Sequence, residues 1–266
     1  MIPRLPGRDN LLDRTAEAWR PPIFQPSKNF FSRCSAIVRR MLDLQAASIW
    51  NDLGKLLGNC DGEFLDVGCG AQPYRSLLPS TVRYTGIDTA NAKDHFGYVV
   101  PDTLYFEGDQ WPVATSSMDV VLATETLEHV SHPDRFLAEA KRCLKSKGAL
   151  VLTIPFSARW HYIPHDYWRF TPSGIRQTLT ESGFGELVVY ARGNEITVGC
   201  YKVMALILAL LFGEFQTVLT KAFARILGVV MLPVLMILAL IGQLSLRSRG
   251  GNDCLGYTIV GRVSGD

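Results

Sequence analysis

Residues 63–88 combine a glycine turn with a carboxylate at a spacing that suits nucleoside binding. The apolar run at 63–67 predicts a strand, and Gly68 and Gly70 directly after it let the backbone turn sharply and lie close to a ligand. Asp88 lies eighteen residues after Gly70, at the end of the next predicted strand. A carboxylate at that place can accept hydrogen bonds from both hydroxyls of a ribose. We therefore expect a nucleoside site here.

Pro73 and Asp66 indicate which nucleoside is bound. A dinucleotide-binding turn needs a third glycine at position 73, where helix and strand pack closely, and this chain has proline there. Asp66 places a negative charge where a diphosphate would be repelled, whereas the same charge suits a sulfonium or ammonium group. Both observations favour S-adenosylmethionine over NAD. We expect Cys69 to touch this ligand through its backbone N–H rather than its thiol.

The segment 157–172 carries the residue types that methyl transfer needs. It holds two histidines, one aspartate, two arginines and five aromatic residues, and it follows a predicted strand at the ligand-binding edge of the sheet. Transfer of a sulfonium methyl group needs an aligned nucleophile and, for an oxygen nucleophile, a base. His161 or His165 could be that base, and Asp166 could orient it. In the alternative interpretation Tyr167, Trp168 and Phe170 pack the loop onto the core and Arg169 pairs with Asp166. For Trp168 and Phe170 we expect this packing role.

The spacing of cysteines and histidines does not indicate a metal site. The six cysteines are scattered without a Cys-x-x-Cys pair, which favours reduced thiols in a cytosolic compartment. His129 and His132 are spaced closely enough to share a metal, as are His161 and His165, but no cysteine is near either pair. We expect no bound metal.

Strands and helices alternate along the chain in a way that predicts the fold class. Helical spacing of apolar residues runs from Phe31 to about Leu57 and predicts one long helix or two short ones. Further helices are predicted at 133–144 and between Thr171 and Gly183. The predicted strands are 63–67, 83–87, 103–106, 118–123, 149–154, 186–190 and 256–263. We expect an α/β fold: a Rossmann-like, seven-stranded, mostly parallel sheet with helices on both faces.

The segment Asp66-Val67-Gly68-Cys69-Gly70 resembles the glycine motif of the class I S-adenosylmethionine-dependent methyltransferases, type 11 in particular. Asp88 matches the ribose-binding acid of that family, residues 107–113 the adenine-contacting stretch, and residues 119–130 the signature after the fourth strand. The resemblance covers roughly residues 60–190 and the last dozen, and departs from the pattern at Gln72, where many members have a third glycine. It leaves open whether Glu107 or Asp109 is the adenine-side acid, and whether Glu128 and His129 touch the cofactor or only cap and pack. The cofactor-binding residues that it implies are Asp66, Gly68, Cys69, Gly70, Asp88, Glu107, Gly108, Asp109, Thr124 and Glu125.

A hydrophobic insertion interrupts the domain at about residues 196–250. Residues 203–212 are an uninterrupted apolar run, and residues 226–246 carry no charge over a length that could cross a bilayer as one helix. The sixth and seventh strands are neighbours in this fold, so the chain must return to the side that it left. The first run is short and Pro233 interrupts the second, so we expect a shallow helical hairpin in one leaflet. The alternative is a soluble subdomain or dimer interface.

These features predict a methyltransferase associated with a membrane. The chain has 266 residues and a net charge of +2, which gives no field for nucleic acid. We expect residues 1–30 to form an N-terminal arm and residues 31–266 to form the methyltransferase domain. Its expected reaction is methylation, at oxygen in preference, of a lipid-borne or lipid-linked small substrate on the cytoplasmic side of a membrane. The alternatives are a soluble cytoplasmic enzyme for small molecules or glycans that forms a homodimer through the insertion, and a cofactor-binding scaffold without catalysis.

Overall fold

The chain folds around one seven-stranded sheet. The computed structural model describes residues 11–15, 17, 38–92 and 99–263. The strand order is β3-β2-β1-β4-β5-β7-β6, with β7 antiparallel to both of its neighbours and the other pairs parallel. The bounds are β1 Glu63–Val67, β2 Arg83–Thr89, β3 Thr103–Phe106, β4 Met118–Thr124, β5 Leu144–Pro155, β6 Phe184–Arg192 and β7 Gly256–Val263. The predicted mostly parallel, Rossmann-like sheet is confirmed.

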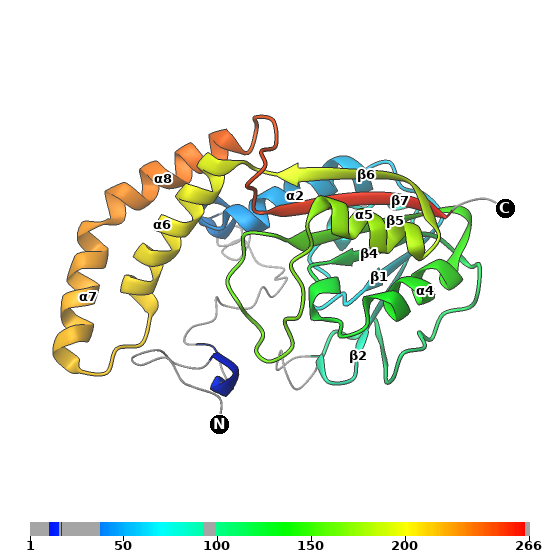
Figure 1. The fold of residues 1–266 in the computed structure, drawn as a ribbon, viewed down its shortest axis with the longest axis horizontal. Helices are drawn as coiled ribbons and strands as arrows, with labels where there is room; N and C mark the ends of the chain where they lie inside the picture. The colour runs from blue at the N-terminus through cyan, green and yellow to red at the C-terminus, as the bar shows by residue number, and fades with distance from the viewer. Residues whose placement is uncertain (1–10, 16, 18–37, 93–98, 264–266) are drawn as a thin grey trace, which may run out of the picture.

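Helices cover both faces of the sheet because alternate strand residues point to opposite sides. On one face α2 (Leu44–Leu57) packs against β1, β4 and β5 through residues such as Phe64 and Leu122. On the other face α4 (Pro133–Cys143) and α5 (Pro172–Glu181) pack against the neighbouring strand positions, among them Leu65 and Val121. Figure 1 shows the sheet between these two layers.

Several element boundaries differ from the predicted ones, among them the start of β5, and a local contact divides the helical stretch before β1. Residues 38–42 are helical, but Asp43 ends this piece and caps α2 by accepting a hydrogen bond from the Ala46 N–H at 3.1 Å. Of the two predicted arrangements, one long helix or two short ones, the described residues show two helical pieces, and the first residues of this stretch lie outside the described ones. β5 begins at Leu144, directly after α4, and not at 149.

The insertion forms three helices, which we call the helical arm: α6 (Glu195–Phe212), α7 (Val218–Val230) and α8 (Leu232–Ser245). α6 packs against α8 and also contacts α7, and together they project from the sheet as a hairpin (Figure 1). The predicted break at Pro233 is present. α7 ends before this proline, which lies in the first turn of α8, and the two helices are bent by 54° relative to each other. The first apolar run, however, belongs to an 18-residue helix and is not short. Among the described residues α6 is the single helix long and apolar enough to cross a membrane, and α7 with α8 would pass the same test as one bent span.

Both ends of the helical arm leave the same edge of the sheet. β6 is antiparallel to β7, which is antiparallel to β5, so β6 runs parallel to the central strands and ends at their carboxyl edge. Two residues separate the end of β6 from the start of α6, and the chain returns from α8 into the start of β7 at that edge. The root of the arm is packed against α2, where Gly242 approaches Leu44 so closely that a Cβ would lie 2.4 Å from Leu44 Cδ1.

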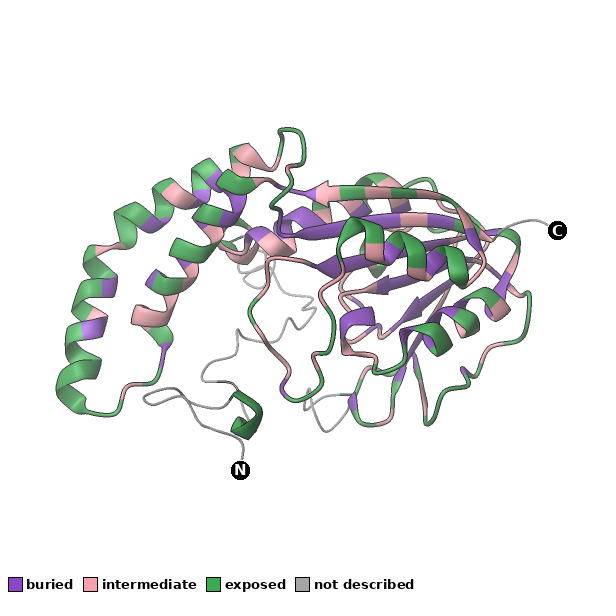
Figure 2. Ribbon diagram, viewed as in Figure 1, coloured by how far each residue is buried: buried purple, intermediate pink, exposed green. Residues whose placement is uncertain are grey.

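The outer part of the helical arm presents apolar side chains to solvent. Figure 2 shows α7 and the far part of α8 largely exposed, in contrast to the buried strands. An exposed apolar surface of this kind on a monomer marks an interaction site. The exposed large apolar residues of α7 and α8 are Val218, Leu219, Phe223, Ile226, Leu227, Val229, Val230, Leu232, Val234, Met236, Ile237, Leu240, Ile241 and Leu244.

Candidate cofactor and acceptor site

The glycine turn after β1 has the predicted backbone geometry. Gly68 and Gly70 have positive φ angles of 68° and 49°. A Cβ at Gly68 would lie 2.7 Å from the Thr126 side chain, so only glycine fits. The N–H groups of Gly68 and Cys69 both point to the Ile87 carbonyl, at 2.9 and 3.2 Å. The Cys69 N–H is thus donated within the protein, contrary to the prediction that it touches the ligand.

The side chain of Gln72 shows why this turn tolerates a residue other than glycine. Gln72 has a φ of 54°, a conformation that glycine adopts without strain. Its amide donates to Thr103 Oγ1 at 3.0 Å and accepts from Arg75 Nη1 at 3.0 Å. These two contacts hold the side chain in place beside the turn.

Asp88 at the end of β2 is positioned to accept two further hydrogen bonds. Its Oδ2 accepts the Gly70 N–H at 2.9 Å and its Oδ1 accepts the Thr89 N–H at 2.8 Å. Each carboxylate oxygen has a second acceptor site, so one remains on each. Burial raises the pKa of Asp88, while the two backbone N–H groups oppose that shift.

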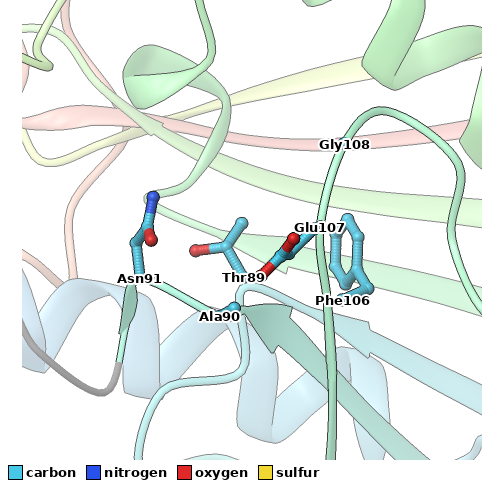
Figure 3. A pocket seen from close by; sticks show the side chains of 6 residues that line it. All are labelled: Thr89, Ala90, Asn91, Phe106, Glu107 and Gly108. Carbon is cyan, nitrogen blue, oxygen red and sulfur yellow. The ribbon is translucent and has the colours of Figure 1, made fainter.

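A cavity of about 380 Å³ lies beside Asp88, between the ends of β2 and β3. Its lining residues are Thr89, Ala90, Asn91, Phe106, Glu107 and Gly108, as Figure 3 shows. Asp109, by contrast, forms an ion pair with Arg135 at 2.9 Å and does not line this cavity. The geometry thus selects Glu107 over Asp109 as the acid on this side.

Asp66 lies beneath the glycine turn and not on its open side. Its carboxylate is buried and accepts a hydrogen bond from the Tyr84 hydroxyl at 2.8 Å. Burial raises the pKa of Asp66 to about 7, and the hydrogen bond from Tyr84 offsets this only in part. The side chain supports the turn from within the core.

Thr124 and Glu125 end β4 at the same edge as Asp88. Glu125 has a φ of 48°, and its carboxylate accepts hydrogen bonds from Arg192 Nη2 at 2.6 Å and Gln45 Nε2 at 3.1 Å. Arg192 is fully buried and also donates to the Ile154 carbonyl at 3.0 Å. Sequence reasoning missed both partners, since a lone arginine and a lone glutamine carry no spacing signal. Together they join α2, β4, β5 and β6 behind the cofactor-binding turn.

The loop at 156–171 docks onto the 3₁₀ helix η3 (Leu127–His129), which follows β4. The Tyr167 N–H donates to the Glu128 carbonyl at 2.8 Å, and the Trp168 indole donates to the Val130 carbonyl at 2.8 Å. Trp168 also stacks on Phe170. Trp168 and Phe170 thus have the structural role that we expected of them, and Phe170 also packs against the core.

Asp166 orients His161, as predicted, and also pairs with Arg169. Its Oδ2 lies 3.1 Å from His161 Nδ1, and its carboxylate accepts two hydrogen bonds from Arg169 at 2.6 and 2.7 Å. Burial alone would raise the pKa of Asp166, but His161 and Arg169 lower it overall. Burial likewise works to lower the pKa of His161, and Asp166 outweighs it, so that this pKa is raised. His165 is exposed and lies 3.2 Å from the Tyr167 hydroxyl.

Glu128 and His129 meet His161, which the sequence did not predict. The Glu128 side chain is fully buried, and neither of its carboxylate oxygens has a hydrogen-bond partner among the described residues. Burial raises its pKa well above the usual value. His129 Nε2 lies 3.6 Å from Glu128 Oε1, its ring packs edge-on to that of His161, and burial lowers its pKa to about 4.

One described residue of the predicted N-terminal arm reaches this loop. Glu17 pairs with Arg159 at 3.0 Å and accepts the Tyr162 N–H at 2.7 Å. Residues 11–13 form a short 3₁₀ helix, and the rest of the predicted arm, apart from residues 14 and 15, lies outside the described residues.

The residues around Asp88 fit S-adenosylmethionine. Two open acceptor sites on a carboxylate suit the two ribose hydroxyls, and the adjoining cavity offers Phe106 and Glu107 to the adenine side. When bound, this cofactor supplies an electrophilic methyl group on sulfur. The turn, Asp88 and the cavity would bind and orient it.

Comparisons with known proteins agree with this geometry. A family model for a methyltransferase domain matches residues 65–152. No curated protein matches the chain. Among solved structures, an S-adenosylmethionine-dependent methyltransferase from Archaeoglobus fulgidus is 15% identical over 88% of this chain and 100% of its own, with a TM-score of 0.50. The cyclase SpnF is 20% identical over 84% of this chain and 83% of its own, with a TM-score of 0.51.

The phosphoethanolamine N-methyltransferase 2 of Haemonchus contortus is 14% identical over 82% of this chain, with a TM-score of 0.47, and the chain spans 53% of its length. At 15% and 20% identity, the Archaeoglobus protein and the cyclase show a shared fold and nothing of the substrate, and the cyclase shows that proteins of this fold are not restricted to one reaction. The match of the family model, the glycine turn and the acid at the end of β2 together identify the cofactor as S-adenosylmethionine. Residues 65–152 thus match the model of a methyltransferase domain, and the sheet that holds them has the Rossmann-like fold of such domains.

Proposed function

We propose that this protein methylates an oxygen atom of a lipid-borne or lipid-linked small substrate at a membrane surface. The observation that carries the proposal is the origin of the helical arm. Its exposed apolar helices leave the sheet at the edge that also holds Asp88 and the loop at 156–171. A surface that enters the lipid headgroup region would bring that edge to a membrane-bound substrate.

The loop that carries His161 is our candidate for the acceptor side of the site. We place the acceptor beside His161, because Asp166 engages Nδ1 and leaves Nε2 free to face a hydroxyl group. The loop that holds His161 is joined to the arm by Lys202, which donates to the Ser157 carbonyl at 2.9 Å. A change in the position of the arm would therefore reach the loop directly.

The helical arm supports attachment to one leaflet without crossing it. α6 runs out and α7 with α8 return to the same edge, so that the chain crosses the bilayer either not at all or twice. α7 and α8 are bent by 54° relative to each other and both expose apolar side chains, which suits insertion into the interfacial layer of the bilayer. The catalytic domain then lies on the cytoplasmic side, with the membrane surface as its partner and no role for nucleic acid.

Binding to liposomes tests the attachment. Leu219 and Leu240 are 83% and 61% exposed, one on α7 and one on α8, and replacing both by glutamate should remove most binding to liposomes in sedimentation. Tyr190→Glu is the matched control, because it changes an exposed apolar residue of β6 outside the arm. Unchanged liposome binding of the double variant would contradict membrane attachment. If that variant instead converts a soluble dimer into a monomer, the arm is a dimer interface.

Methyl transfer is tested with labelled S-adenosylmethionine and lipid extracts. We expect label in the lipid fraction with the parent protein, and none with Asp88→Ala. Cofactor binding without transfer to any lipid, glycan or small-molecule fraction would support the cofactor-binding scaffold instead. A methyl ester loses its label in mild base, whereas a methyl ether keeps it, so this treatment distinguishes the two products. Label on nitrogen would contradict oxygen as the acceptor.

A further inference from the structure

We propose that Glu128, His129 and His161 together bind a divalent transition-metal ion. The three residues come from η3 and from the loop after β5, and their ligand atoms all lie within 4.8 Å of one another. Metal–ligand bonds of about 2.0–2.2 Å bring ligand atoms to roughly 3–4 Å from one another. Small side-chain rotations would complete the site.

The hydrogen bonds of both histidines leave the same nitrogen free for a metal. His129 Nδ1 lies 2.7 Å from the His165 carbonyl, and His161 Nδ1 lies 3.0 Å from the Arg159 carbonyl and 3.1 Å from Asp166 Oδ2. A carbonyl can only accept, so each Nδ1 carries the proton and each Nε2 keeps its lone pair. The Arg169 donor near His161 Nδ1 is farther away, at 3.3 Å. Histidine ligands of metals are typically held through the second nitrogen in this way.

The Glu128 carboxylate supplies the independent observation. It is fully buried, and within the described part of the chain neither oxygen has a hydrogen-bond partner. A buried polar group without a partner is costly unless something else satisfies it. A cation held between Glu128 Oε1 and the adjacent His129 Nε2, which are 3.6 Å apart, would supply that partner.

The ligand set indicates the kind of ion. Two imidazole nitrogens and one carboxylate suit Zn²⁺, Fe²⁺ or Co²⁺ more than Mg²⁺ or Ca²⁺, which prefer oxygen ligands. Three protein ligands also leave at least one coordination position for a water or an acceptor oxygen. With the ion on Nε2, the His161 ring cannot take a proton from the acceptor hydroxyl, so the acceptor oxygen would bind the metal in place of facing the ring. This role of the metal rests on the proposed function, whereas metal binding does not.

Metal titration of the full-length protein tests the site directly. After removal of metals with a chelator, Co²⁺ should give the visible absorption of a low-coordinate site, and Zn²⁺ should displace it with one ion per chain. Glu128→Gln and His161→Ala should each weaken Zn²⁺ binding by about 100-fold or more, and Asp166→Asn, a positioning change, by about 10- to 100-fold. His132→Ala is the control, because His132 is exposed and outside the cluster, and it should bind Zn²⁺ like the parent.

Two results would overturn the inference. One is the absence of Co²⁺ absorption and Zn²⁺ binding in a parent protein that is folded and binds S-adenosylhomocysteine. The other is equal Zn²⁺ binding by the parent and by Glu128→Gln and His161→Ala, with unchanged circular dichroism. In either case Glu128 is a protonated carboxyl in the core. Metal binding without methyl transfer would uphold this site and contradict the proposed function alone.

Discussion

Replacing Asp88 by asparagine should weaken cofactor binding and loosen the glycine turn as two separate effects. In the parent, one carboxylate oxygen accepts the Gly70 N–H and the other accepts the Thr89 N–H. Asparagine keeps one of these oxygens and turns the other into an NH₂ group. That NH₂ faces a backbone donor and can accept no bond from a ribose hydroxyl.

The size of each effect follows from these contacts. Loss of one hydrogen bond to a charged acceptor costs about 1.5–3 kcal/mol, which is roughly 10- to 150-fold in Kd. The backbone N–H that loses its acceptor should lower the free energy of unfolding by about 1–3 kcal/mol. The two effects are measurable independently, because the second is present with or without ligand.

Isothermal titration with S-adenosylhomocysteine gives the first effect and urea unfolding gives the second. Asp109→Asn is the matched control, since Asp109 pairs with Arg135 outside the cavity and should leave Kd unchanged. Binding of S-adenosylhomocysteine by Asp88→Asn within about threefold of the parent would refute a ribose contact of Asp88. A lower unfolding free energy with an unchanged Kd for S-adenosylhomocysteine would mean that Asp88 stabilises the glycine turn and does not bind the ribose.

Three further substitutions test other parts of the structure. Glu107→Gln should raise the Kd for S-adenosylhomocysteine by about tenfold, the cost of one weakened hydrogen bond, whereas Asp109→Asn should not; equal effects would contradict the choice of Glu107. Arg192→Met should lower the free energy of urea unfolding by about 3–5 kcal/mol, because Glu125 then lacks its buried cation. Adding Glu125→Gln to this variant should restore part of the loss. If the effects of the two substitutions simply add, Arg192 and Glu125 are not coupled. Burial raises the pKa of Asp66 to about 7 from 3.8, so the folded chain keeps a proton that the unfolded chain releases. The stability that this group contributes is therefore full below about pH 4 and falls by up to about 4 kcal/mol by pH 7. The unfolding free energy of Asp66→Asn should lack that loss between about pH 4 and pH 7. Identical pH profiles for both proteins would contradict the raised pKa of Asp66.

The elements around the cofactor were predictable because their signals are local. β1, β3 and β7 have the predicted bounds, since each is a short apolar run closed by turn residues. Gly68, Gly70 and Asp88 came together as expected because parallel strands end at one edge. The helical character of the insertion and its break at Pro233 also followed from the sequence alone.

The partners of polar side chains could not be predicted in the same way. The sequence left Glu107 and Asp109 as two candidate acids. The ion pair of Asp109 with Arg135, which lies on a different element, could not be predicted from it. Arg192 and Glu125 are 67 residues apart, and no periodicity links them. Such pairs depend on which loops the crossovers bring together, and this is a property of the whole sheet.

The sequence by itself therefore determined the class of fold, the cofactor and the position of Asp88 near the end of its strand, because these depend on residue type and on spacing within one strand–turn–strand unit. Only the tertiary structure decided that Glu128, His129 and His161 converge, that the Cys69 N–H is used within the protein, and that the helical arm leaves the sheet beside them. The physical reason is that hydrophobic periodicity specifies elements, whereas the contacts between loops at the sheet edge are set by the order and direction in which seven strands pair.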